Sequence, residues 1–186
     1  MNRVSAIVRC RLVVVILAGF VLATASPQIG FAQSNLVGTT WKLNVAQSKF
    51  SPGPAPRSST LTYEAVGQGF RATNEGIDAR GNPTKGVFGV YFYDGKSYPV
   101  TGVADYDAST YKMLNDSTAE LSRTKDGKVA QTVTRTLSAD GKTLTFTGTG
   151  VNANGQQVNY VAVYDKQLVT TSPRLAIPAR GRAGFV

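Results

Sequence analysis

The sequence has 186 residues, a formal net charge of +9, a single cysteine and no histidine. The missing histidine excludes hydrolases that use a histidine base, Cys–His dyads and zinc or iron sites with histidine ligands. The basic balance does not indicate a nucleic-acid partner: three of the positive charges lie in residues 1–32, three lie after Lys166, and the remaining cations alternate with acids.

Residues 1–32 are expected to be a secretory signal peptide. Three arginines precede the apolar run Leu12–Leu22, which is shorter than the about 20 residues that a bilayer span needs. Small residues at −3 and −1 predict cleavage after Ala25 or Ala32. We therefore expect a secreted or periplasmic protein without an integral membrane segment in the mature chain. Removal of Cys10 with the signal would leave no disulfide, thiolate or iron–sulfur ligand.

The rest of the chain predicts short strands joined by tight turns, with no helix longer than a turn or two. Asp-Gly or Asn-Gly pairs at 94–95, 126–127, 140–141 and 154–155 tolerate the positive φ of hairpin turns. The ten predicted strands lie near 38–44, 59–65, 70–77, 85–93, 96–103, 109–114, 118–125, 128–137, 142–149 and 156–165.

Apolar and polar residues alternate along most of these strands. In 128–137, for example, Val129, Val133 and Leu137 share one face, and threonines occupy the other. This pattern predicts an all-β fold whose apolar face is covered either by closing into a barrel or by stacking as a sandwich. We expect the former: a single antiparallel up-and-down β-barrel of about 8–10 short strands, covering residues 33–168. The Thr-rich outer face argues against an outer-membrane barrel, which needs an apolar band. The side chains expected inside are Leu61, Tyr63, Phe70, Leu121, Val133, Leu144 and Phe146, with Trp41 plugging one end.

Three segments depart from this alternation. The strand 85–93 is apolar on both sides, so we expect something to cover its outer face. The Pro-rich segment 51–56 is expected to be an ordered loop or a lid. Residues 169–186 mix Pro, Gly, Arg and small residues, which predicts a disordered basic tail.

The acids offer one enzymatic option, a glycosidase-like carboxylate pair. Asp105 and Asp107 stand two residues apart and could alternatively hold a hard cation, but two carboxylates are too few to define a metal site. The other aspartates stand in turns, where they are usually solvated. The sequence thus predicts no catalytic residue, metal site or cofactor.

Two stretches resemble the calycin barrels. Val37–Leu43, with Gly38 and Trp41, resembles the opening of the lipocalins and fatty-acid-binding proteins, although two residues rather than one separate its Gly and Trp. The last third is similar in pattern to the fatty-acid-binding proteins, in which an Arg on one strand and an Arg-x-Tyr on the last hold the ligand carboxylate. The resemblance places Arg135 on the first of these positions and Tyr164 on the tyrosine, whereas Ala162 replaces the second arginine. It implies a calycin-like barrel.

Two arginines stand on the apolar faces of neighbouring strands. Arg123 follows Leu121, and Arg135 lies between Val133 and Leu137. Both could extend to the barrel rim with their stems packed on apolar neighbours, or they could receive the polar or anionic head of an amphipathic ligand. The pairs expected across the two hairpins are Arg123–Val129, Leu137–Lys142 and Arg135–Leu144. The candidate ligand-binding residues are Arg135, Arg123, Tyr164, Tyr63 and Phe146.

These patterns favour an exported lipocalin-like barrel that binds a small, mainly apolar or amphipathic molecule. An alternative is a structural or interaction protein of the cell envelope, whose barrel is filled by side chains and holds no ligand. A hydrolase or isomerase without histidine is the third class. A cavity would favour the first, a solid interior the second and paired inward carboxylates the third; no pattern indicates an oligomeric state.

Overall fold

The structure is a computed structural model that describes residues 36–168. The predicted signal peptide and basic tail lie outside these residues, and both stay predictions. The described chain forms eleven strands and contains no helix that is long and apolar enough to cross a membrane. The strands are β1 (Thr40–Leu43), β2 (Lys49–Ser51), β3 (Ser58–Val66), β4 (Gly69–Ile77), β5 (Pro83–Tyr91), β6 (Asp94–Thr101), β7 (Ala108–Met113), β8 (Thr118–Lys125), β9 (Lys128–Leu137), β10 (Thr143–Val151) and β11 (Gln157–Gln167).

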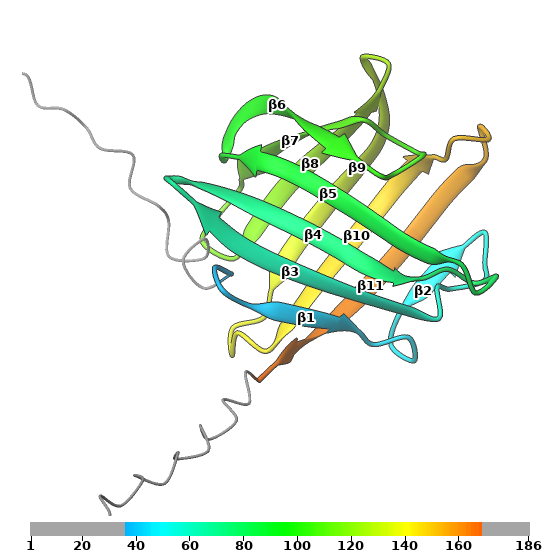
Figure 1. The fold of residues 1–186 in the computed structure, drawn as a ribbon, viewed down its shortest axis with the longest axis horizontal. Coiled ribbons are helices and arrows are strands. Elements are labelled where there is room, and N and C mark those ends of the chain that lie inside the picture. Colours follow the sequence, from blue (N-terminus) through cyan, green and yellow to red (C-terminus); the bar gives the residue numbers. More distant parts are fainter. Residues whose placement is uncertain (1–35, 169–186) are drawn as a thin grey trace, which may run out of the picture.

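Ten of these strands form one closed barrel (Figure 1). From β3 to β11 each strand pairs antiparallel with the next, and β1 pairs with both β3 and β11, which closes the sheet. The ten predicted strands and the up-and-down barrel are therefore confirmed. The short β2 was not predicted; it pairs with β11 and places Phe50 beside Tyr160, immediately before the Pro-rich loop.

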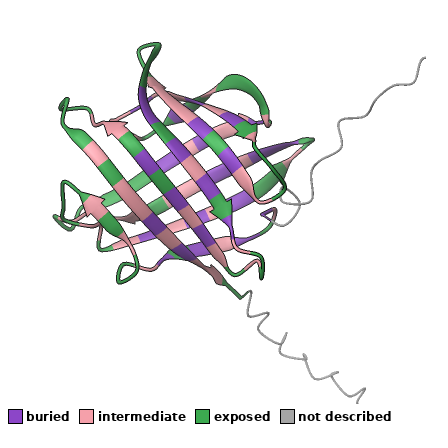
Figure 2. Cartoon of the chain, turned by 180° about the vertical axis from the view of Figure 1, so that it is seen from behind, coloured by how far each residue is buried: buried purple, intermediate pink, exposed green. Residues whose placement is uncertain are grey.

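The core lies inside the barrel, as the alternation of buried and exposed residues along the strands shows (Figure 2). All eight side chains predicted to point inward are buried, and Trp41, Val133 and Leu144 are fully enclosed. Near the end of the barrel where β1 begins, Trp41 Nε1 donates to Thr39 Oγ1 at 2.7 Å, and the Thr39 hydroxyl donates to the Leu36 carbonyl at 2.5 Å. Each fully buried large apolar side chain contributes about 1.5–3 kcal/mol, so this set supplies most of the driving force for folding.

Strand β5 carries apolar side chains on both faces, as predicted for 85–93, but a bulge changes which residues share a face. Its pairing with β4 shifts at a bulge, so Phe88 and Tyr91 are both buried although they stand three residues apart. Val90 and Phe92 then point outward above Gly69, where a Cβ would lie 2.7 Å from Val90 Cγ1. Phe92 remains 39% exposed, so the expected cover is not present over it within residues 36–168.

The β8–β9 hairpin is tighter than predicted. Asp126 and Gly127 both adopt positive φ (49° and 75°), which gives a two-residue turn. A bulge at the start of β9 then leaves Arg123 opposite Gln131 instead of Val129, which is 64% exposed. The predicted Arg123–Val129 pair and the inward position of Val129 are therefore wrong.

The β9–β10 loop is longer than predicted. The Asp140 carboxylate accepts hydrogen bonds from the Lys142 backbone N–H at 3.0 Å and the Ser138 hydroxyl at 2.6 Å, so Lys142 stays in the loop and outside the ladder. The predicted register is therefore wrong by two residues. Side chains along a strand alternate between its two faces with a period of two residues, so a register shift of two residues leaves the same side chains pointing inward. The observed pairs are Leu137–Leu144 and Arg135–Phe146.

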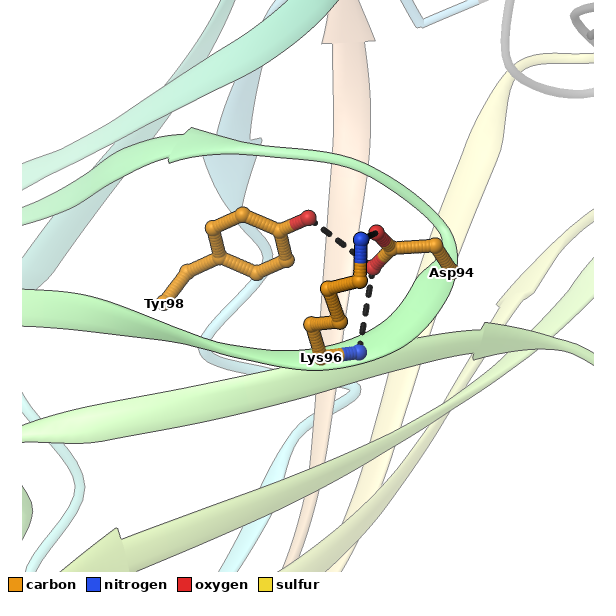
Figure 3. A network of polar contacts seen from close by, with 3 residues as sticks. All are labelled: Asp94, Lys96 and Tyr98. Carbon is orange, nitrogen blue, oxygen red and sulfur yellow. Dashed lines mark hydrogen bonds and ion pairs between the residues drawn. The ribbon is translucent and has the colours of Figure 1, made fainter.

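Asp94 organises the turn between β5 and β6 (Figure 3). Its Oδ1 accepts hydrogen bonds from the Lys96 backbone N–H at 3.0 Å and the Tyr98 hydroxyl at 2.9 Å, and Oδ2 lies 3.2 Å from Lys96 Nζ. The backbone hydrogen bond from Lys96 is the main reason that the pKa of Asp94 lies below its ordinary value. The Asp94-Gly95-Lys96 motif is thus a turn device, with Gly95 at φ 75°.

Candidate functional site: a cationic, tyrosine-lined cavity

A cavity of about 160 Å³ lies inside the barrel. Apolar and tyrosine side chains from strands all around the barrel line it, together with two arginines. Ala162, which stands where the resemblance would place a second arginine, contributes to the wall and leaves the space open. All five predicted candidate residues border this cavity: Arg135, Arg123, Tyr164, Tyr63 and Phe146.

Arg135 projects into the cavity from β9 and is only 1% exposed, so it does not reach the rim. Its Nη1 donates a hydrogen bond to the Tyr93 hydroxyl, and its guanidinium carbon lies 5.2 Å from the centre of that ring. Nη2 lies 4.0 Å from the sulfur of Met113. Its Nε is buried and has no hydrogen-bond partner among the described residues.

Arg123 enters the same cavity from β8. Its Nη1 donates to the Tyr160 hydroxyl at 2.8 Å and to Gln131 Oε1 at 3.2 Å, and its guanidinium carbon lies 4.5 Å from the centre of the Tyr106 ring. The Nε of Arg123 is also buried without a hydrogen-bond partner in the described chain. Both arginines therefore keep donor capacity inside the barrel.

A glycine makes the contact between Arg123 and Tyr160 possible. Gly148 on β10 pairs with Tyr160 on β11, and a Cβ at Gly148 would stand 2.2 Å from Tyr160 Cζ. The phenol ring lies over the bare backbone, which brings its hydroxyl to the guanidinium. Sequence reasoning missed Tyr160; the glycine inside a strand pattern was the available signal for a close approach.

The two arginines occupy different ends of the cavity wall. In the β8–β9 ladder Arg135 lies opposite Ala119, and Arg123 lies opposite Gln131. The two positions are four residues apart, which corresponds to about 13 Å along the strands. Arg135 is nearer the end of the barrel where β1 begins, and Arg123 is nearer the opposite end.

The tyrosines are neutral partners for these cations. Burial raises the pKa of Tyr106 to about 12, although Arg123 acts in the opposite direction, and burial also raises the pKa of Tyr63. Burial acts to lower the pKa of both arginines. At the high pH where a guanidinium would titrate, the surrounding tyrosines are ionised and outweigh burial, so each pKa lies above its ordinary value. Among the described residues, neither Asp nor Glu lines the cavity, which therefore carries two positive charges.

Tyr164 is not bonded to either arginine. Its hydroxyl shares a hydrogen bond with Ser59 Oγ at 2.9 Å and accepts one from Asn74 Nδ2 at 3.4 Å, and Phe146 packs edge-on against its ring. The structure therefore places Tyr164 in the cavity wall, on a polar cluster of its own.

A stacked tyrosine pair forms another part of the wall. Tyr91 and Tyr111 lie parallel, with their ring centres 3.8 Å apart and an interplanar angle of 14°. The alternation along 85–93 had assigned Tyr91 and Phe88 to opposite faces, and the bulge in β5 is what turns both inward. This stacked aromatic pair was therefore not predicted.

A second hollow, of about 250 Å³, adjoins the first at the end of the barrel nearer Arg123. Arg123, Tyr106, Tyr160 and Phe50 border both spaces, and Phe50 stacks on Tyr160 with ring centres 6.1 Å apart. Of these two spaces, Asp105 borders only the outer hollow. Arg123 thus stands between the inner cavity and the outer hollow.

The two acids of the predicted carboxylate pair, Asp105 and Asp107, do not face a common site. Asp105 Oδ1 accepts the Ala153 backbone N–H at 2.9 Å, whereas Asp107 Oδ2 accepts the Asp126 backbone N–H at 3.0 Å. The two acids brace different loops. Within residues 36–168 there is no cluster of three or more His, Cys, Asp or Glu side chains that could hold a metal ion.

Comparisons with known proteins gave two similar solved structures. No protein-family model matches the sequence, and no curated protein gives a significant match. Zebrafish ileal bile acid-binding protein, solved with cholic acid, is similar at 14% identity and a TM-score of 0.45, over 72% of this chain and 99% of that one. The redesigned β-barrel mFAP1, solved with DFHBI, gives 14% identity and a TM-score of 0.41, over 73% of this chain and 98% of its own. The fold is calycin-like. Its up-and-down strand order and the closure between β1 and β11 are the features that make it so.

Proposed function

We propose that this calycin-like barrel binds a small, mainly apolar or amphipathic molecule, whose polar or anionic end meets the interior arginines. The observation that carries the proposal is the pair of interior guanidinium groups, of the buried Arg135 and the half-buried Arg123, in a mainly apolar and aromatic cavity. Burying an uncompensated cation costs several kcal/mol, and neutral tyrosine hydroxyls repay only part of that cost. An anionic group in the cavity would supply the missing partner.

The other two classes have less support. A side-chain-filled structural barrel does not account for a cavity of about 160 Å³ bordered by two arginines with unused donors. A hydrolase or isomerase without histidine needs paired inward acids, and Asp105 and Asp107 instead hold separate loops. Small-molecule sites typically combine apolar walls with a few convergent polar groups, which is the composition found here.

We also propose that the protein acts outside the cytoplasm, as a secreted or periplasmic protein. The support is the predicted signal peptide at 1–32. Amino-terminal sequencing of exported protein should give a start at Ser26 or Gln33. Membrane-bound protein that retains Met1 would contradict this proposal.

Binding is tested in two steps. Native mass spectrometry of protein purified from its own envelope should show an additional small-molecule mass. The protein is then unfolded, freed of that molecule, refolded and titrated with an anionic fluorescent lipid probe. Arg135→Leu should weaken binding of the probe at least about tenfold, since a hydrogen bond to a charged group is worth roughly 1.5–3 kcal/mol.

Arg80→Leu provides the matched control, because Arg80 is an exposed loop arginine that does not line the cavity. This variant should bind the probe as the unmodified protein does. Equal affinity in the unmodified protein and Arg135→Leu would remove the role of Arg135. Absence of both a co-purified molecule and probe binding would remove the proposed function.

A further inference from the structure

We infer that the ligand is a compact dianion, with a core of one or two rings and an acidic group at each end, one meeting Arg123 and the other Arg135. This inference rests on the proposed function and narrows the class of molecule. The acidic groups could be carboxylates, sulfonates or phosphates.

The first support is charge. The cavity holds two guanidinium groups, and neither has an ion-pair partner within residues 36–168. A ligand with one acid would compensate one of them and leave the other buried without a counter-charge, which is costly in a low-dielectric interior. Two acidic groups match the two cations.

The second support is placement. The arginines lie about four residues apart along the β8–β9 ladder, so their backbone positions are separated by about 13 Å. Arg135 is anchored by Tyr93 and Arg123 by Tyr160, which holds the guanidinium groups on separate tyrosines. This separation favours a molecule with acids at opposite ends, which could meet both arginines, over a single carboxylate.

The third support is size and surface. The inner cavity of about 160 Å³ is close to an engineered cavity of about 150 Å³ that binds benzene, which is too small for a long alkyl chain. The stacked Tyr91 and Tyr111 both border the cavity and can contact an aromatic ring, because aromatic rings attract each other in offset or edge-on packing. The outer hollow beyond Arg123 leaves room for a second ring or for the outer acidic group.

The test compares two molecules of nearly equal size and different charge, by calorimetric titration of the refolded protein. Terephthalate carries a carboxylate at each end of one ring, and monomethyl terephthalate carries only one. Terephthalate should bind at least about tenfold more tightly. In Arg123→Met and in Arg135→Met, terephthalate should lose that advantage and bind like the monoester, whereas Arg80→Met should keep it.

Circular dichroism confirms that each variant is folded, and Arg123→Lys and Arg135→Lys replace any methionine variant that is not. The lysine variants keep a cation but lose the planar donor set, so they should bind terephthalate more weakly than the unmodified protein.

Several outcomes would overturn the inference while leaving the proposed function intact. These are equal affinity for terephthalate and its monoester, tighter binding of laurate than of terephthalate, or a co-purified ligand with fewer than two acidic groups. Inorganic phosphate that binds as tightly as terephthalate would overturn the ring-sized core. No binding of any of these compounds, together with no co-purified molecule, would overturn both the inference and the proposed function.

Discussion

Replacing Arg135 with methionine should stabilise the ligand-free protein, even though it weakens ligand binding. The guanidinium is 1% exposed, and its desolvation costs several kcal/mol. In return it makes one hydrogen bond to Tyr93 and lies 5.2 Å from that ring, contacts worth roughly 2–4 kcal/mol together. Methionine keeps an apolar stem of similar length, and Tyr93 is only partly buried, so its hydroxyl can be rehydrated. The expected gain in unfolding free energy is about 1–2 kcal/mol.

If Arg135 has a structural role instead, its replacement should lower the free energy of unfolding. If Arg135 were a fully compensated structural residue, its removal would cost about 3–5 kcal/mol, as for other broken buried pairs. Urea unfolding, followed by circular dichroism and by the fluorescence of Trp41, distinguishes the two. With a denaturant slope of about 2 kcal/mol per molar, the expected gain raises the midpoint by about 0.5–1 M. A midpoint lowered by more than about 0.5 M would refute the reasoning, and Arg80→Met should leave the midpoint unchanged.

Other consequences of the structure can be measured on the same protein. Gly148→Ala should displace the Tyr160 ring and cost about 1–3 kcal/mol of unfolding free energy, and an unchanged urea midpoint would contradict the packing described here. Leu144→Ala, at a fully buried site, should cost about 2–5 kcal/mol, whereas Leu168→Ala, at an exposed site, should cost almost nothing; equal losses would be inconsistent with the barrel core. Because folding raises the pKa of Tyr106 to about 12, the folded state favours the protonated phenol, and this stability is present below pH 10 and lost as pH rises from 10 toward 12. Absorbance at 295 nm should therefore show buried tyrosines ionising together with unfolding, and ionisation near pH 10 in a folded protein would be the contrary result.

The sequence by itself determined the strands, most of the inward set and the position of Arg135 on the apolar face of its strand. Alternation with a period of two is a property of each strand, so Leu61, Leu144 and Phe146 could be assigned to the core without knowing any neighbour. The Asp-Gly and Asn-Gly pairs marked turns, because their local φ preference does not depend on the rest of the fold. Closure into a barrel could be predicted because a long meander with one apolar face must cover that face.

The tertiary structure alone decided the register, the bulges and hence the site. The bulge in β5 turned Tyr91 inward, and the bulge in β9 set Arg123 opposite Gln131. Bulges bend a strand and increase its local twist where a closing sheet must curve, so their positions depend on neighbouring strands and cannot be read from the alternation of one strand. The partnership of Arg123 with Tyr160 likewise depends on strands far apart in the sequence. The cavity volume depends on how all these side chains fill one barrel, which is why local patterns could predict an interior with arginines but not its size or contacts.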